Sequence, residues 1–272
     1  MIQEKVLYLR VSKINSIMID FPFLYRATVF TYTIKPETEN IQRIQHLFED
    51  KGLLPSMFQE NFNGIPTMRF EMIVPNGDWR IRFLEQRIDI VKSVDFKDVT
   101  KMVKEQSFCS LAMDCFQKIM TEFGYKASRL AFSGIYILKE CDFQIVYNKL
   151  IHPCELFEKE KPKEWNFRNV FRFTKSINGK PNILNYCFDA NIGMVESAFP
   201  TLFKSERIIL STDINTLQEE TIDYKYTQED ISDFFKNISL WNEEVKESYC
   251  KYTGKGLHLP FNTLYFYQDQ KG

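Results

Sequence analysis

The segment 70–83 alternates apolar and polar residues on both sides of Asn76-Gly77. Alternation with a period of two is typical of β-strands, and Asn-Gly tolerates the positive φ angles of a type I′ turn. The pattern predicts a hairpin. Its apolar face pairs Val74 with Trp79, Met72 with Ile81 and Phe70 with Phe83, while its polar face pairs Glu71 with Arg82 and Ile73 with Arg80. A further strand over 86–92 would complete a meander.

Three longer segments carry apolar residues at the spacing of an amphipathic helix. The segments, each with the residues expected to begin and end its helix, are 36–52 (Pro36, Gly52), 95–124 (Asp95 as N-cap, Gly124) and 227–254 (Thr227, Gly254). The second is expected either as one long helix or as two helices with a break near Ser107. Thr227 and Asp230 resemble a capping box in which Asp replaces Glu. A shorter helical stretch is expected over 142–151.

Strands are expected over the remaining segments rich in aromatic and β-branched residues: 25–35, 128–140, 165–177, 182–195 and 206–217. The order strand, helix, antiparallel meander, long helix then occurs twice. The sequence therefore predicts an α+β fold of two similar halves, 1–124 and 125–272, packed as one globular unit. Helices on one face of such a sheet would leave the other face exposed or covered by a partner.

Charge and composition narrow the classes of partner. The chain has 272 residues, with 35 basic and 36 acidic side chains, so no global field draws it to nucleic acid or to a membrane. No apolar run is long enough to span a bilayer, and the first residues do not resemble a signal peptide. Six cysteines form no CxxC pair and are expected as reduced thiols. These features predict a cytoplasmic protein without a membrane partner.

The two ends of this order of elements carry motifs that match a known group. "FPFLYRATVFTYTIKP" (21–36) supplies Phe21, Pro22 and Pro36, and "ILSTDINTL" followed by "SLWNEEVKESYCKYTG" supplies Asp213, Tyr249 and Thr253. With these motifs the chain resembles a sporadically distributed family of uncharacterised prokaryotic proteins. In the middle it departs, because "RLAFSGIYIL" replaces that family's arginine-rich strand. The resemblance implies a cytosolic protein, sometimes carried on mobile or defence loci, and implies no catalytic residue.

Metal and nucleophile chemistry find little support in the sequence. His46, His152 and His258 lie far apart and in none of the usual zinc spacings, so neither a metal site nor a cofactor is expected. His46, beside Leu47, is expected as a partly buried structural residue. Cys115 lies on the apolar face of its helix and is expected in the core, whereas Cys109 lies off that face and is expected to be exposed.

Carboxylates near the end of the chain provide one enzymatic hypothesis. Asp213 lies in a predicted strand, and Asp223 and Lys225 form a D-x-K triplet ten residues later. Nucleases of the PD-(D/E)xK type use two carboxylates to hold Mg²⁺ and a lysine beside the attacking water. The three residues are therefore candidates for a metal-dependent nuclease site.

Arginines of the meander provide a second hypothesis. Arg69, Arg80, Arg82 and Arg87 would share its polar side, where they could bind nucleic acid. Arg82 is expected opposite Glu71, and Arg87 near Asp89, which leaves Arg69 and Arg80 as the uncompensated charges.

The third hypothesis, which the sequence favours, is a non-enzymatic interaction protein: a sensor, adaptor or scaffold subunit of a bacterial anti-phage or mobile-element system. It would bind a protein partner, as a hetero- or homo-oligomer. No cluster of catalytic residue types stands out along the chain, and broad sheet faces with long helices suit such a role.

Overall fold

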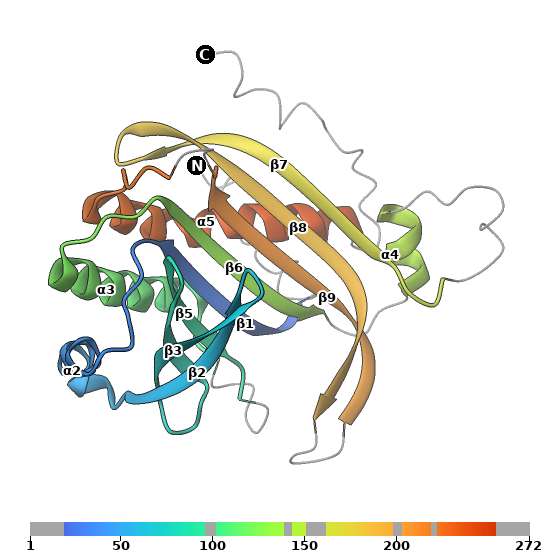
Figure 1. Ribbon diagram of the computed structural model, residues 1–272. Helices are drawn as coiled ribbons and strands as arrows, with labels where there is room; N and C mark the ends of the chain where they lie inside the picture. Colours follow the sequence, from blue (N-terminus) through green and yellow to red (C-terminus); the bar gives the residue numbers. More distant parts are fainter. Residues whose placement is uncertain are drawn as a thin grey trace, which may run out of the picture.

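The fold is described from a computed structural model, for residues 19–95, 102–138, 143–150, 162–197, 203–218 and 222–253. Nine antiparallel strands form one sheet, in the order β2-β3-β4-β5-β1-β6-β9-β8-β7, with helices packed beside it (Figure 1). The predicted α+β class is therefore confirmed.

The strands are β1 (Ile19–Phe30), β2 (Leu54–Phe62), β3 (Ile65–Ile73), β4 (Trp79–Leu84), β5 (Arg87–Ser93), β6 (Arg129–Leu138), β7 (Asn166–Ile177), β8 (Lys180–Ser197) and β9 (Phe203–Thr216). The helices are α2 (Thr38–Leu47), α3 (Glu105–Phe123), α4 (Phe143–Leu150) and α5 (Gln228–Thr253), with a 3₁₀ turn, η1 (Glu49–Lys51), after α2.

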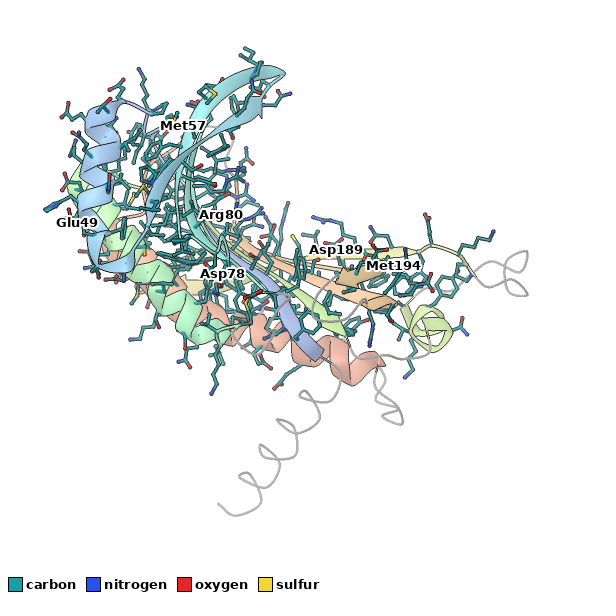
Figure 2. The ribbon with its side chains drawn as sticks, turned by 90° about the horizontal axis from the view of Figure 1, so that it is seen from below. Glu49, Met57, Asp78, Arg80, Asp189 and Met194 are labelled. Carbon is teal, nitrogen blue, oxygen red and sulfur yellow. The ribbon has the colours of Figure 1, made fainter. Side chains whose placement is uncertain are left out.

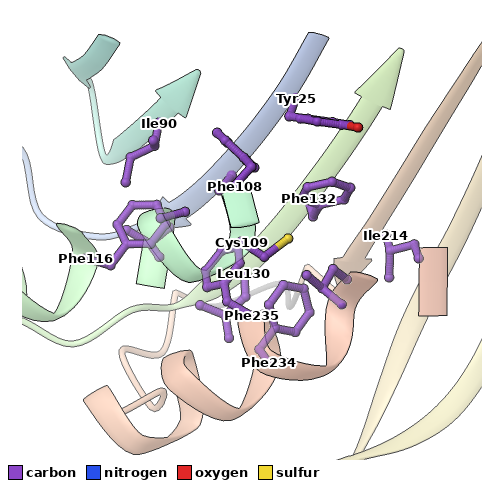
Figure 3. Close-up of a cluster of buried hydrophobic side chains, with 14 of the residues drawn as sticks. Tyr25, Ile90, Phe108, Cys109, Phe116, Leu130, Phe132, Ile214, Phe234 and Phe235 are labelled. Atoms are coloured by element: carbon purple, nitrogen blue, oxygen red, sulfur yellow. The ribbon is translucent and has the colours of Figure 1, made fainter. Parts of the chain in front are cut away.

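One face of the sheet is covered by α3 and α5, which also pack on each other, while α2 packs on α3 and α4 on α5. Apolar stripes on these helices meet alternate side chains of the strands (Figure 3). Phe108 of α3 packs on Tyr25 of β1 with ring centroids 5.5 Å apart, and Phe116 packs on Phe235 of α5 at 5.2 Å. We call this side of the sheet the helix face.

The opposite side, the open face, has no helix against it among the described residues. Figure 2 shows that the sheet is curved, with the helices along its outer side and the β2–β3 hairpin rising at one end. Arg80 and Asp189 lie on the inner, concave side in this view. The curvature places residues from strands at the two ends of the sheet around one hollow surface.

The two meanders join the sheet in the same way. β5, the last strand of the first meander, pairs with β1, and β9, the last of the second, pairs with β6. β1 and β6 pair with each other at the centre. The strands that precede residue 124 and those that follow it therefore belong to one continuous sheet.

Most predicted elements are present, but the second helix does not run unbroken from Asp95 to Gly124. α3 begins at Glu105 with Lys104 as N-cap, not at Asp95, because residues 102–104 are non-helical. Its end is as predicted: Gly124 has φ 66°, and the N–H of Tyr125 donates to the carbonyl of Met120. β2 was not predicted at all, since its apolar residues do not alternate.

The predicted hairpin register is confirmed, with Phe70, Met72 and Ile73 opposite Phe83, Ile81 and Arg80. The type I′ turn is wrong, because Asn76 does not have a positive φ. Pro75 fixes φ at the second position of a turn that closes through the Gly77 N–H and the Val74 carbonyl at 2.8 Å. Gly254, His152 and His258 lie outside the described residues.

Candidate functional site

The open face is distinguished by its cations. Side chains alternate along a strand, so Arg26 lies opposite the face on which Tyr25 and Ala27 are buried, and strand register extends this assignment across the sheet. All nine arginines of the strands lie on the open face: Arg26, Arg69, Arg80, Arg82, Arg87, Arg129, Arg168, Arg172 and Arg207. All four lysines of the strands, Lys92, Lys175, Lys180 and Lys204, lie on the helix face.

Some of these arginines alternate with apolar side chains in rows across the strands. Phe30 of β1 lies opposite Arg87 of β5 on one side and Arg129 of β6 on the other. Leu84 of β4 extends this row, since it lies opposite Arg87 on the other side of β5. A separate pair of the same kind is formed by Phe58 of β2 and Arg69 of β3. Neighbouring strands are about 4.8 Å apart, so Arg87 and Arg129 originate about 10 Å from each other.

The acidic side chains of this face are fewer: Glu60, Glu71, Asp89, Asp189 and Asp213. The predicted pairs are confirmed, with Arg82 Nε 3.3 Å from Glu71 and Arg87 Nε 3.7 Å from Asp89. Within the described residues Arg26 is exposed and makes no ion pair, and Arg172 is paired only with the neutral Asn185. The open face therefore has an excess of positive charge, although the whole chain does not.

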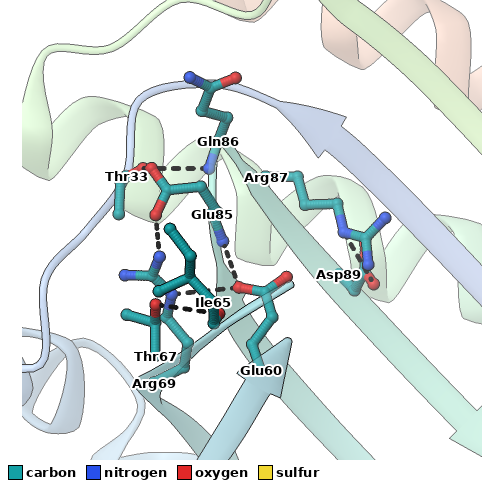
Figure 4. A network of polar contacts seen from close by, with 9 residues as sticks. All are labelled: Thr33, Glu60, Ile65, Thr67, Arg69, Glu85, Gln86, Arg87 and Asp89. Carbon is teal, nitrogen blue, oxygen red and sulfur yellow. Dashed lines mark hydrogen bonds and ion pairs between the residues drawn. The ribbon is translucent and has the colours of Figure 1, made fainter. Parts of the chain in front are cut away.

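The sequence suggested that the charge of Arg69 is uncompensated, and this was wrong. Arg69 is 5% exposed, and its guanidinium donates to the carboxylates of Glu60 and Glu85 (Figure 4). Glu60 belongs to β2, so its position could not be inferred without that strand. Arg80 is compensated too, since it lies 3.9 Å from Glu71 and donates to the Gly77 carbonyl at 2.8 Å. Arg69 is thus a structural residue of the face.

A groove of about 540 Å³ lies at one edge of the open face, where β1 and β4 end and β5 and β6 begin. It is lined by residues of the β2–β3 hairpin, the β4–β5 turn, the ends of β1 and β6 and the segments after β9: Phe30, Glu60, Asn61, Phe62, Asn63, Glu85, Gln86, Arg87, Ser128, Arg129, Gln218, Ile222, Asp223 and Tyr224. Aromatic, amide, carboxylate and guanidinium groups are thus gathered in one concave site.

Arg129 is held rigidly in the wall of this groove. Its guanidinium donates to the carbonyl of Thr216 at 3.1 Å and to the side-chain oxygens of Asn215 at 2.7 Å and Gln218 at 3.2 Å. It also lies over the ring of Phe30, 5.0 Å from the centroid. A planar cation fixed in this way can stack on a second planar group without losing further conformational freedom.

Gln86, in the β4–β5 turn, has a strained backbone. Its φ is 55°, a left-handed conformation that costs a residue with a side chain about 1 kcal/mol. Its N–H donates to Thr33 Oγ1 at 3.0 Å and its carbonyl accepts from the Thr31 N–H at 2.9 Å, which holds the turn in place. Strained residues of this kind cluster at binding sites.

The three nuclease candidates lie on β9, in the groove and directly after it. Asp213 lies on β9 within the open face and accepts a hydrogen bond from Asn215 at 3.0 Å. Asp223 lines the groove, and Lys225 Nζ lies 5.4 Å from the centroid of the Tyr226 ring. Within the described ranges, no three side chains of the His, Cys, Asp or Glu type are grouped so that they could hold a metal ion.

Two expectations about individual residues were wrong. His46 is exposed, not partly buried, and its ring lies 3.3 Å from Glu49 one turn ahead, on the side of α2 away from α3. Cys109 is buried, because α3 packs on α5 as well as on the sheet and so has a wider buried side than its apolar stripe suggests. Cys115 is buried as predicted, and burial raises the pKa of its thiol to about 12. Neither thiol has the lowered pKa of a nucleophile.

None of the helices in the described part of the chain is long and apolar enough to cross a membrane. Comparison with models of protein families, with curated proteins and with solved structures finds no match for this chain. The open face and its groove are therefore interpreted from their own chemistry.

Proposed function

We propose that the protein is a non-enzymatic interaction protein that binds nucleic acid through the open face of its sheet. The observation that carries this proposal is the separation of cations: every strand arginine faces the concave side and every strand lysine faces the helices. A guanidinium matches a phosphate with two parallel hydrogen bonds, and it also stacks on aromatic rings and bases, whereas an ammonium does neither.

The arrangement of the arginines favours a polymer of phosphates over an isolated anion. Arginines occur on seven strands, and Arg87 and Arg129 flank an aromatic ring in one row. Basic side chains interleaved with aromatic ones are typical of surfaces that bind single-stranded nucleic acid. Because several arginines are already paired with carboxylates, we expect moderate affinity that decreases steeply with salt.

A protein partner has separate support at the β2–β3 hairpin. Leu54 and Met57 of the edge strand β2 and Ile65 and Met68 of the neighbouring β3 are each about half exposed or more, and β2 itself carries no lysine or arginine. Natural edge strands are usually protected by charge, so an apolar edge indicates a docking surface. We propose this hairpin as the site of the expected protein partner. Cytosolic location and a role in defence or mobile elements stay predictions from the sequence.

The similar order of elements on either side of residue 124 supports a further proposal, that the two halves arose by duplication. In both, a strand and a helix precede a meander whose last strand returns to pair with the first, and a long helix follows. Under this proposal the open face is a single binding surface built from two related halves.

The proposal is tested by fluorescence anisotropy of labelled single-stranded and duplex oligonucleotides, at about 50 and 200 mM salt. We expect binding to the single strand at low salt and its loss at high salt. Incubation of the complex with Mg²⁺ should leave the strand intact, whereas nicking that Asp213→Ala abolishes would establish the nuclease hypothesis. Absence of binding at low salt, with capture of an acidic protein instead, would overturn the proposal.

A further inference from the structure

We infer that the groove at the edge of the open face is a base-binding subsite that receives one nucleotide of a bound single strand. This inference rests on the proposed function and adds to it a site and a ligand class. The groove of about 540 Å³ lies within the range of small-molecule sites and continues directly from the arginine-bearing surface, since Arg87 and Arg129 belong to both.

The charges of the groove are suited to a base and not to a phosphate alone. Glu85 and Asp223 would repel a phosphate placed deep in the groove, but their oxygens can accept hydrogen bonds from the exocyclic amino groups of bases. Gln86 and Gln218 add amides that can both donate and accept. The phosphates of the same strand would lie towards Arg87, on the open face.

Planar groups for stacking are also present and held in place. Arg129 is fixed by three hydrogen bonds and by the Phe30 ring, and guanidinium planes are common stacking partners of unpaired bases. Tyr224 is held by a stacked contact with Tyr32, with centroids 3.9 Å apart and an interplanar angle of 16°. Phe62, at the tip of the β2–β3 hairpin, is 39% exposed and lines the same site.

The strained turn adds independent support. Gln86, which lines the groove, keeps a left-handed backbone in which glycine would be more stable. Gln86→Gly should therefore stabilise the protein slightly while it weakens binding. A residue with a purely structural role would not show these opposite changes.

The experiment measures the affinity of short homopolymeric DNA strands of each base, and the competition of each by 5′-mononucleotides. We expect a preference of roughly fivefold or more for at least one base, and displacement of the labelled strand by the matching mononucleotide at millimolar concentration. Gln86→Gly, Gln218→Ala and Arg129→Lys should each reduce the preference. Gln59→Ala is the matched control, because Gln59 is exposed on the helix face of β2 and does not line the groove.

The outcomes separate this inference from the proposal on which it rests. Salt-dependent binding of all four homopolymers with equal affinity, unchanged in the groove variants, would overturn the subsite and leave the proposed function standing. Mononucleotide binding that is lost in Arg129→Lys, without any binding of oligonucleotides, would support the groove and overturn the proposed function. Loss of affinity in Gln59→Ala equal to that in Gln218→Ala would also overturn the subsite.

Discussion

A buried polar network beneath the sheet links α3, α5 and β6. The Tyr136 hydroxyl donates to Glu105 Oε2 at 2.5 Å and accepts from Asn242 Nδ2 at 2.6 Å, and Lys246 Nζ lies 3.0 Å from the same carboxylate oxygen. Gly134 makes room for this tyrosine, because a Cβ at 134 would lie 2.3 Å from its hydroxyl. Each member is buried, so loss of one leaves its partners unsatisfied.

Replacing Tyr136 with Phe should lower the free energy of unfolding by about 1–3 kcal/mol, since Asn242 loses its acceptor in a site without solvent. Denaturant unfolding of the purified protein measures the change. Tyr186→Phe is the matched control, because the buried Tyr186 hydroxyl makes no hydrogen bond within the described residues. Its stability should change by less than about 0.5 kcal/mol, and equal losses in both variants would contradict the network.

The buried thiols predict a loss of stability in alkali. Burial raises the pKa of Cys115 to about 12. Burial, and to a lesser extent the negative charge of the nearby Glu105, raise the pKa of Cys109 well above its usual range. Unfolded thiols ionise near about pH 8.5, so the folded state binds more protons above that pH. The stabilisation is complete below about pH 8.5 and decreases by about 1.4 kcal/mol per thiol for each pH unit above it.

Urea unfolding of the reduced protein between about pH 7.5 and 10 tests this dependence. Cys115→Ala should lose stability at all pH values and show a shallower decrease above about pH 8.5, because one thiol no longer ionises on unfolding. A decrease as steep as that of the wild type would show that Cys115 does not contribute.

Residue pairs were predictable where they are local. Arg82–Glu71 and Arg87–Asp89 follow from alternation and a short hairpin, and both are present. Arg69 was misjudged because one of its partners, Glu60, lies on β2, a strand whose own residues do not alternate between apolar and polar. The charge balance of a side chain is therefore mispredicted when the strand that carries its partner is missed, even if the side chain itself is placed correctly.

At the scale of elements, three Asn-Gly dipeptides show that the neighbouring residues decide which turn the same two residues form. Asn63-Gly64 and Asn178-Gly179 both have positive φ angles and join β2 to β3 and β7 to β8 through two-residue turns. Asn76-Gly77 does not, because Pro75 imposes another turn before it. The same signal at 63–64 could have revealed β2 from the sequence.

The cap of α5 was predicted correctly and also anchors a neighbouring hairpin. Asp230 Oδ2 accepts from the Thr227 N–H at 2.9 Å, and Asp230 Oδ1 accepts from Asn178 Nδ2 at 3.0 Å. Asp230→Ala should therefore cost about 1–2 kcal/mol in the free energy of unfolding. Lys236→Ala, at an exposed position of the same helix, should cost less than about 0.5 kcal/mol. Thermal or denaturant unfolding compares the two, and similar values would contradict the cap.

At the scale of the whole molecule, the open face could not be predicted from the sequence. Local patterns place each arginine on a side of its own strand, but the join between the two meanders depends on the β1–β6 pairing, which no local signal reveals. That pairing brings Arg26 and Arg129 together with arginines from both ends of the sheet. The near-neutral net charge of the chain conceals this local excess.

The central claim, that arginines of the open face contact phosphates, is tested most directly by the salt dependence of oligonucleotide affinity in two double variants. Arg26→Ala/Arg172→Ala removes two exposed cations of the open face that make no ion pair within the described residues. Lys180→Ala/Lys236→Ala removes the same charge from the helix side.

For a single strand, the slope of log affinity against log salt should become shallower by about 1.4 in the arginine variant, since each lost phosphate contact contributes about 0.7. The lysine variant should retain the wild-type slope. An unchanged slope in the arginine variant, or an equal change in both, would contradict the account.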